Sequence, residues 1–108
     1  MANTYKSTAL NLSTTGSFTL YTVPQNTTTL VKSCYCGNVY PANVSIDIFI
    51  EKSGSSTDSY LISGALVPFQ ASFQPITEPI ILQEEDSIKA STTTSGSIDT
   101  LLSYVELT

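Results

Sequence analysis

The chain has 108 residues, of which 41% are hydrophobic and 12% are charged, so we expect a single domain over residues 1–108 with one modest core. Its four lysines, nine acidic residues and lack of histidine and arginine give a net charge of −5, and such an acidic chain is not expected to bind nucleic acid. The absence of histidine also removes the usual general base and zinc ligand, which excludes most hydrolytic and metal chemistry.

Short runs of β-branched and aromatic residues recur along the chain with turn residues between them, and no stretch has a sustained helical period. This pattern is typical of antiparallel sheets. We expect an all-β, antiparallel two-sheet β-sandwich of the jelly-roll or Greek-key kind, with eight or nine strands. The expected strands are 5–11, 17–23, 28–36, 44–51, 60–63, 71–74, 80–82, 87–93 and 98–107.

The N-terminal residues, Met1 to Lys6, are polar, and no apolar run nearby is long enough for a signal-peptide core or a membrane span. We therefore expect synthesis in a cytosol and no membrane partner. The mature protein is expected to stay in that compartment until it assembles.

The expected strand 28–36 contains both cysteines of the chain, Cys34 and Cys36. Their spacing places the two thiols on one face of a strand, where a disulfide between them would be geometrically poor. We expect both to be reduced and to fill core positions. Lys32 falls on the same face, so we expect it near the margin of the sheet, with its stem buried and its ammonium in water.

The expected strand 44–51 has the clearest alternation, with four aliphatic residues on its inner face and Phe49 on its outer face. If this strand forms a hairpin with strand 28–36, Val31 lies opposite Phe49, and Tyr35 shares their outer face. Two explanations are open for this apolar outer patch. The N-terminal strand or a loop of the same chain covers it, or a partner subunit does, since exposed apolar patches tend to mark interfaces.

Two corners of the chain are similar in sequence. Val23-Pro24 and Val67-Pro68 each end an apolar run and lead into another strand. Similar corners in the two halves suit a Greek-key or jelly-roll topology.

A third corner carries three consecutive acidic residues, Glu84, Glu85 and Asp86, between two expected strands. We interpret it as a solvated turn in which Asp86 caps local backbone donors and the charges discourage edge pairing. A calcium site is the alternative, because hard cations bind clustered carboxylate oxygens.

The expected last strand, 98–107, has apolar residues on both faces, so neither face is clearly suited to water. We therefore predict that the protein is a homo-oligomer or a lattice-bound subunit, with coverage by its own N-terminal strand or a loop as the alternative. The predicted subunit interface consists of Val31, Tyr35, Phe49, Leu101 and Val105.

No catalytic constellation is recognisable in the sequence. The serines have no histidine partner, the five glycines are not spaced as in a phosphate-binding loop, and the remaining acidic residues are scattered. We expect no enzyme activity, no catalytic residue, no cofactor and no bound metal.

Three segments resemble a group of small virion structural proteins from tailed bacteriophages, common in phages of aquatic bacteria and cyanobacteria. Residues 21–33, which begin Tyr-Thr-Val-Pro-Gln-Asn, resemble the opening of that family. Residues 81–91 resemble its penultimate hairpin, and residues 97–107 resemble its closing strand. This sequence departs from the family at Cys34-Tyr35-Cys36, where aliphatic residues are usual, and at Glu84-Glu85, where a small residue and glycine are usual.

The resemblance implies a non-enzymatic β-sandwich protein that assembles in many copies on a phage particle and is synthesised in the host cytoplasm. Head decoration (cement), neck (collar) and tail-associated positions are all compatible with it, and the expected partners are other virion proteins. The alternative is a receptor- or glycan-binding module of a tail or head fibre. Its aromatic platform would come from Tyr40, Tyr60 and Phe69, which lie in or beside expected loops.

Overall fold

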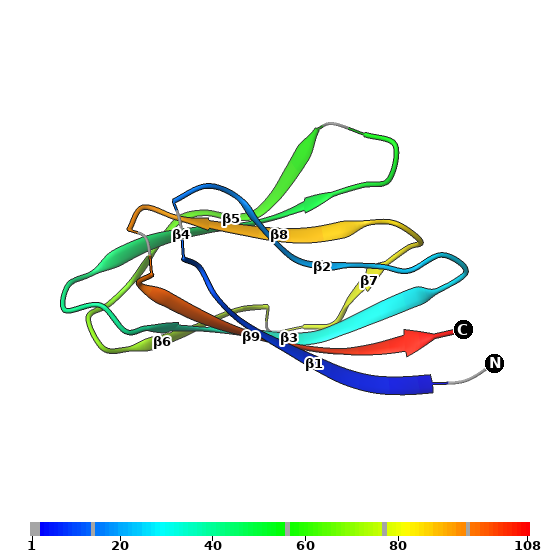
Figure 1. Cartoon of the computed structure of the whole chain (residues 1–108), viewed down its shortest axis with the longest axis horizontal. Coiled ribbons are helices and arrows are strands. Elements are labelled where there is room, and N and C mark those ends of the chain that lie inside the picture. Colours follow the sequence, from blue (N-terminus) through cyan, green and yellow to red (C-terminus); the bar gives the residue numbers. More distant parts are fainter. Residues whose placement is uncertain (1–2, 14, 56, 77, 95) are drawn as a thin grey trace.

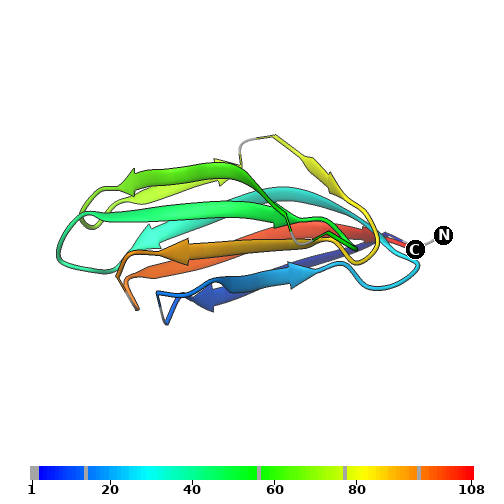
Figure 2. The ribbon, with the colours of Figure 1, turned by 90° about the horizontal axis from the view of Figure 1, so that it is seen from above.

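Nine antiparallel strands form two sheets that face each other across a shared apolar interior (Figures 1 and 2). The computed structural model describes residues 3–13, 15–55, 57–76, 78–94 and 96–108, and these residues form no helix. The strands are β1 (Asn3–Asn11), β2 (Phe18–Thr22), β3 (Thr28–Asn38), β4 (Val44–Glu51), β5 (Asp58–Val67), β6 (Ser72–Ile76), β7 (Ile80–Leu82), β8 (Ser87–Thr92) and β9 (Ile98–Leu107).

The strand order defines the topology. The first sheet, called sheet A, has the order β1-β9-β3-β6, with β7 also paired to β3; the second, sheet B, has the order β2-β8-β4-β5. Consecutive strands mostly alternate between the two sheets, and this arrangement of a five-stranded and a four-stranded layer is that of a jelly roll. The structure confirms the predicted all-β, two-sheet sandwich, and its nine strands lie close to the expected ranges.

The two Val-Pro corners have equivalent places in this topology. Val23 begins the connection from β2 to β3, and Val67 is the last residue of β5 before the connection to β6, so each corner carries the chain from sheet B to sheet A. Both valines are buried, and each is followed three residues later by a left-handed residue, Asn26 (φ 58°) or Gln70 (φ 54°). The sequence similarity of the corners therefore corresponds to a repeated structural role.

The predicted hairpin between strands 28–36 and 44–51 is wrong, because β3 and β4 lie in different sheets. β3 pairs with β9, β6 and β7, whereas β4 pairs with β5 and β8. Both strands point an aliphatic row into the interior, and in a sandwich two such rows pack face to face without pairing edge to edge. The alternation of apolar and polar residues along a strand indicates which face of the strand is buried. It does not indicate which other strand is the hydrogen-bonding partner.

A β-bulge at Lys32 changes which side chains of β3 are buried. Val31 is opposite Tyr104 on β9, but Ser33 is opposite Ser103, so Lys32 is the extra residue of β3. Beyond the bulge, the face that points inward switches from odd to even positions. Val31 is consequently fully buried, and Lys32 is exposed instead of lying at a sheet margin on the inner face.

The interior is filled mainly by aliphatic side chains from both sheets. Cys34 and Cys36 are free thiols that are fully buried, which confirms their predicted core positions. The largest fully buried side chains include Leu12, Ile46, Ile48, Leu82, Ile88, Ile98 and Leu102.

Candidate functional site

The outer face of sheet A carries side chains arranged in rows that cross the strands. One apolar row contains Tyr5, Val105, Leu30 and Ile81, which are successive neighbours on β1, β9, β3 and β7. A second apolar row contains Ala9, Leu101 and Tyr35, on β1, β9 and β3. Between the two rows lies a row of serines, Ser7, Ser103 and Ser33.

The first row leaves large apolar groups in solvent at its two ends. Tyr5 is 74% exposed and Ile81 is 66% exposed, while Val105 between Tyr5 and Leu30 is 5% exposed. Val105 is shielded by its neighbours on the same face of the sheet and does not lie in the interior. The row is therefore a continuous apolar strip with exposed aromatic and aliphatic ends.

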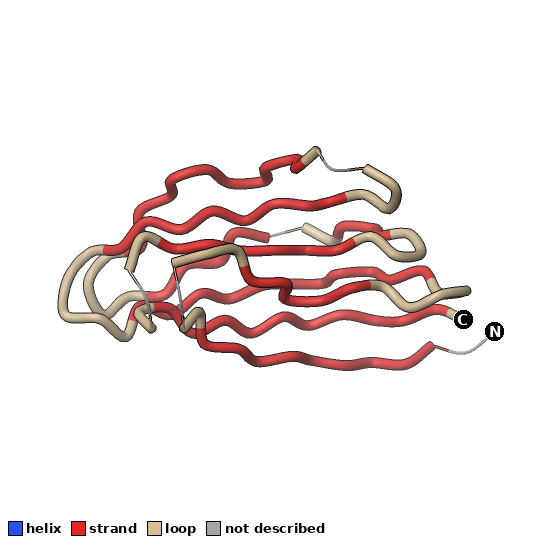
Figure 3. The backbone as a smooth tube through the Cα atoms, turned by 45° about the horizontal axis from the view of Figure 1, so that its top comes forward, coloured by secondary structure: helices blue, strands red, loops and turns tan. Residues whose placement is uncertain are grey.

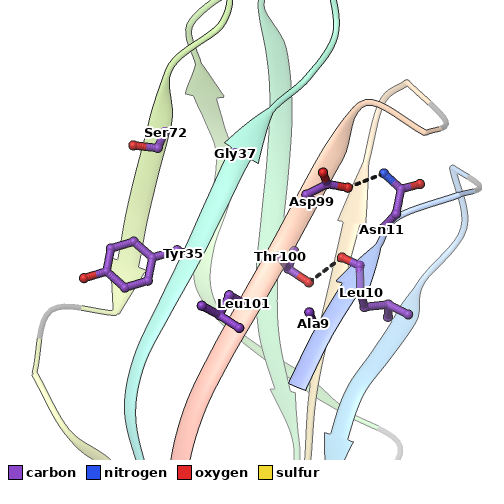
Figure 4. Close-up of a pocket in the computed structure, with 9 residues that line it drawn as sticks. All are labelled: Ala9, Leu10, Asn11, Tyr35, Gly37, Ser72, Asp99, Thr100 and Leu101. Atoms are coloured by element: carbon purple, nitrogen blue, oxygen red, sulfur yellow. Dashed lines mark hydrogen bonds between the residues drawn. The ribbon is translucent and has the colours of Figure 1, made fainter. Parts of the chain in front are cut away.

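The second row borders a shallow depression in the outer face (Figure 4). Its volume is about 510 Å³, and Tyr35, Leu101 and Ala9 lie along it on three neighbouring strands. Polar groups from Asn11 and Asp99, which are joined by a hydrogen bond of 2.7 Å, border the same depression. The second row and this depression together offer an accessible apolar contact surface.

Three of the five predicted interface residues lie on this face of sheet A. Tyr35 and Leu101 are adjacent and exposed to 46% and 40%, and Val105 belongs to the first apolar row. The structure does not bring Val31 to this surface, because the Lys32 bulge turns it into the core.

Phe49 also lies away from this surface. It is on the outer side of sheet B, where it is only 2% exposed. The ring of Tyr60 on β5 packs against it, with the ring centroids 4.9 Å apart. The protein's own β5 therefore covers Phe49, so the cover belongs to the same chain but is neither of the two expected segments, the N-terminal strand or a loop.

Tyr5, Leu30 and Ile81 were not among the predicted interface residues. A signal in the sequence existed only for Tyr5. This large aromatic side chain lies on the same face as Ser7 and Ala9 in an otherwise polar strand. For Leu30 and Ile81 no signal existed, because their place in the row depends on the pairing of these two residues, which are 51 positions apart in the chain.

The outer face of sheet B has a different chemical character. On β2, β8 and β4 its exposed and half-buried side chains are largely hydroxyl-bearing or charged, such as Thr19, Ser91 and Asp47. The edge strand β5 instead exposes Tyr60, Leu61 and Leu66. Lys89 and Glu51 form an ion pair at 3.2 Å across β8 and β4. The part of this face on β2, β8 and β4 is suited to water, and the large exposed apolar side chains of sheet B lie on its edge strand β5, whereas those of sheet A are spread over neighbouring strands.

A polar cluster joins the two sheets near the termini. The carboxylate of Glu106 accepts hydrogen bonds from the Lys6 ammonium at 2.8 Å and from the Tyr21 hydroxyl at 2.6 Å. These two contacts lower the pKa of Glu106, and burial together with the bond to Glu106 raises the pKa of Tyr21. The cluster attaches β1 and β2 to β9.

The acidic corner is partly solvated and partly buried. Glu84 and Glu85 are exposed, but Asp86 is 1% exposed, so the prediction of a solvated turn is wrong for that residue. Its carboxylate accepts hydrogen bonds from the backbone of Gln83 at 2.8 Å, which confirms the predicted capping, and from Lys52 and the backbone of Ser53. Within the described ranges, no cluster of three or more His, Cys, Asp or Glu residues could hold a metal ion.

Glu85 has a left-handed backbone, with φ of 66°. Glycine adopts this conformation without strain. Glu85 therefore has a backbone conformation typical of glycine, at the position where the family resemblance implies a glycine.

Two loops at one end of the sandwich present aromatic side chains. Tyr40 and Phe69 are exposed to 40% and 49% and lie in the β3–β4 and β5–β6 connections, which meet at the same end (Figure 1). The buried amide of Asn38 donates to the carbonyl oxygens of both loops, and Asn43 accepts from the backbone of Phe69 at 2.8 Å. Tyr60, the third residue of the predicted platform, is on β5 and lies over Phe49.

Comparisons with known proteins identify the fold. No protein-family model and no curated protein sequence matches the chain. A chain in the acidic stable capsid structure of Helicobacter pylori bacteriophage KHP30 superposes with a TM-score of 0.56, at 8% identity, over 98% of this chain and 87% of that one. A chain in the structure of the Gt strain of infectious bursal disease virus gives a TM-score of 0.38, at 12% identity, over 99% of this chain and 31% of that one. The KHP30 likeness establishes a shared β-sandwich fold over nearly the whole length of this chain.

Proposed function

We propose that this protein is a non-enzymatic structural component of a bacteriophage particle, present in many copies as a head decoration (cement) protein or a neck (collar) component. It is synthesised in the host cytoplasm and is carried on the virion. The observation that carries the proposal is the pair of exposed apolar rows on the outer face of sheet A. The fold shared with a chain of the KHP30 capsid supports it.

The contact with neighbouring virion proteins is formed by the accessible parts of this face. Tyr35 and Leu101 from the predicted interface take part, together with Tyr5 and Ile81. Tyrosine is enriched at protein interfaces, and the buried core of an interface is more apolar than the remaining surface. Val31 and Phe49 expose almost no surface and stabilise the subunit itself.

Few long, flexible charged side chains lie around the two rows, and this favours assembly, although Lys32 is exposed at the bulge of β3. Serines and threonines lose little side-chain entropy when a surface is buried, and the middle row of this face consists of serines. Other charged groups, which are costly to desolvate, include the ion pair on the outer face of sheet B and the Lys6–Glu106 pair, whereas Asp99 borders the depression beside the second row.

A charge placed on this face tests the proposal. Leu101→Asp puts a carboxylate into the second row, and Leu66→Asp is the matched control, because Leu66 is an exposed strand leucine on sheet B. Particles assembled with each variant are purified, and the copies per particle are counted by quantitative mass spectrometry. Leu101→Asp should reduce incorporation by at least about tenfold, a loss of about 1.4 kcal/mol of binding, and Leu66→Asp should leave it unchanged. Equal incorporation of both variants would contradict the assigned face.

The alternative function, receptor or glycan binding, is favoured by Tyr40 and Phe69 on their paired loops. Exposed aromatic rings on a rigid loop pair are suited to stacking against apolar faces of a ligand. Substitution of both rings by alanine separates the two functions. Normal incorporation with lost adsorption to host cells would favour recognition, and unchanged adsorption would favour assembly alone.

A further inference from the structure

β1 forms the outer edge of sheet A, and among the described residues no strand pairs with its far side (Figure 3). Its ladder with β9 runs without interruption from Asn3 to Asn11. The edge strands β2, β5 and β6 have register shifts in their ladders, and β7 has three residues. Irregular or short edges resist pairing with other chains. β1 lacks this protection and is the edge best suited to accept another strand.

The backbone groups on the free edge follow from the ladder. Leu12, the residue after β1, donates its N–H to the carbonyl oxygen of Ile98 at 2.9 Å. Alternation along an antiparallel ladder then directs the polar backbone groups of even-numbered residues of β1 toward β9, and those of odd-numbered residues toward the free edge. The side chains of these odd-numbered residues are all exposed. They are Asn3, Tyr5, Ser7, Ala9 and Asn11.

We propose that two copies of this chain pair through their β1 strands, antiparallel and around a two-fold axis at Ser7, so that their two A sheets become one continuous sheet. In this register Ser7 faces Ser7 of the second copy, and Tyr5 faces Ala9. Asn3 faces Asn11. These facing pairs of odd-numbered residues each exchange two backbone hydrogen bonds, and they alternate with pairs of even-numbered residues that exchange none. This pairing uses the edge of the sheet and does not depend on the virion role.

The rows on the outer face select this register. The rows through Tyr5 and Ala9 are equally distant from the serine row through Ser7. Pairing around Ser7 therefore joins the first apolar row of one copy to the second apolar row of the other, and the serine rows join each other. A shift by two residues would place Tyr5 opposite Ser7 or Asn11 and would interrupt both apolar rows.

The shapes on the two sides of the axis also match. Tyr5 is 74% exposed, and Ala9, the residue that it faces, borders the depression of about 510 Å³ beside Leu101 (Figure 4). Directly opposite side chains on one face of an antiparallel pair have Cβ atoms about 5 Å apart. The ring of Tyr5 thus reaches the depression of the second copy, and the ring of the second copy reaches the depression of the first.

The charge on the strand permits the pairing. Lys6 is the single charged residue of β1, and its ammonium lies 2.8 Å from the Glu106 carboxylate of the same copy. Opposite charge within each copy therefore reduces repulsion between the two Lys6 side chains near the axis.

Sedimentation velocity of the full chain, from low micromolar to near-millimolar concentrations, tests the proposal together with amide hydrogen exchange. The expected result is a reversible monomer–dimer equilibrium. In the dimer, the amides of Tyr5, Ser7 and Ala9 become protected as concentration rises, whereas even-numbered amides of β1 are protected at all concentrations. A mass that stays monomeric throughout, or odd-numbered amides that exchange rapidly in the dimer, would overturn it.

Variants give a second test. Ser7→Pro removes an N–H that points to the free edge and that the ladder with β9 does not use, so it should abolish the dimer, and Ser7→Ala should preserve it. Tyr5→Ser should raise the dimer dissociation constant about tenfold, equivalent to about 1.4 kcal/mol, while Tyr40→Ser at the far loops should not. A Ser7→Pro protein that still dimerises would show that another surface associates. Should that variant fail to fold, hydrogen exchange in the wild-type protein decides the question.

Discussion

Val31 and Tyr35 lie on the same strand at positions of the same parity, yet Val31 is fully buried between the sheets and Tyr35 is 46% exposed on the outer face. The extra residue between them, Lys32, reverses the side of the sheet to which the following residues point. The bulge thus assigns Val31 to the core and Tyr35 to the candidate contact surface. An intact bulge therefore determines both which side chains of β3 pack in the core and which are exposed on the outer face.

Deletion of Lys32 should destabilise the protein strongly. Without the extra residue, the part of β3 on one side of the bulge must turn its buried side chains into solvent, either Val31 and Thr29 or the two cysteines. Loss of such core contacts is expected to cost on the order of 3 kcal/mol or more. Denaturant unfolding monitored by circular dichroism measures the change. The substitution Lys32→Ala keeps the bulge and should stay within about 0.5 kcal/mol of the wild type.

Phe49 should behave as a stability residue of the subunit. Its ring is 2% exposed and packs against Tyr60, so Phe49→Ala should lower the free energy of unfolding by about 3 kcal/mol. The same unfolding experiment checks this, with Leu66→Ala as an exposed control on the same sheet. A Phe49→Ala protein that is as stable as the wild type but fails to associate would show instead that Phe49 belongs to the subunit interface.

Acid should destabilise the protein through Asp86 and Glu106. Burial alone raises the pKa of Asp86, but hydrogen bonds from Lys52, Ser53 and Gln83 outweigh it, and the pKa is lowered. The pKa of Glu106 is lowered by Lys6 and Tyr21. Because both folded pKa values lie below the unfolded values of about 3.9 and 4.3, the stabilisation is fully present above about pH 5 and is lost as pH falls through the folded pKa values.

Thermal unfolding across pH measures this dependence. The wild-type melting temperature should decline steadily below about pH 5. Asp86→Asn should cost about 2 kcal/mol at neutral pH, because it leaves buried donors poorly satisfied, and should flatten the acid decline. Asp58→Asn, at an exposed aspartate of β5, should reproduce the wild-type profile. Identical pH profiles for the wild type and Asp86→Asn would refute the role of Asp86.

The two thiols should be unreactive in the native protein. The hydrogen bond with Cys34 and burial raise the pKa of Cys36, and both side chains are fully buried. Labelling needs a thiolate with access to the reagent, so labelling of both residues should follow global unfolding and rise steeply with denaturant. Rapid labelling without denaturant, or disulfide-linked oligomers on a non-reducing gel, would contradict this expectation.

The strands and the two-sheet sandwich could be predicted from the sequence, because side-chain alternation and turn residues are local signals. Even there, strand 60–63 was expected to end before Gly64, whereas β5 continues to Val67, with Gly64 at φ 68° beside a register shift within the strand. A left-handed glycine marks either a turn or a bulge, and local sequence does not distinguish the two.

Strand pairing and the surface rows could not be predicted in the same way. Leu101 and Tyr35 were chosen correctly as outward residues, but their adjacency depends on the pairing of β3 with β9. Ile81 joins the first row only because β7 pairs with the beginning of β3. Such neighbours are brought together by topology, which periodicity within a single strand does not contain.

Cryo-electron microscopy of purified particles that carry this protein tests the proposed function most directly. The account predicts repeated copies of the jelly roll on the head or neck, with the outer face of sheet A, including Tyr35 and Leu101, buried against a neighbouring virion subunit and the outer face of sheet B in solvent. Particles without the protein, or copies attached through the outer face of sheet B with Tyr35 and Leu101 exposed, would contradict it.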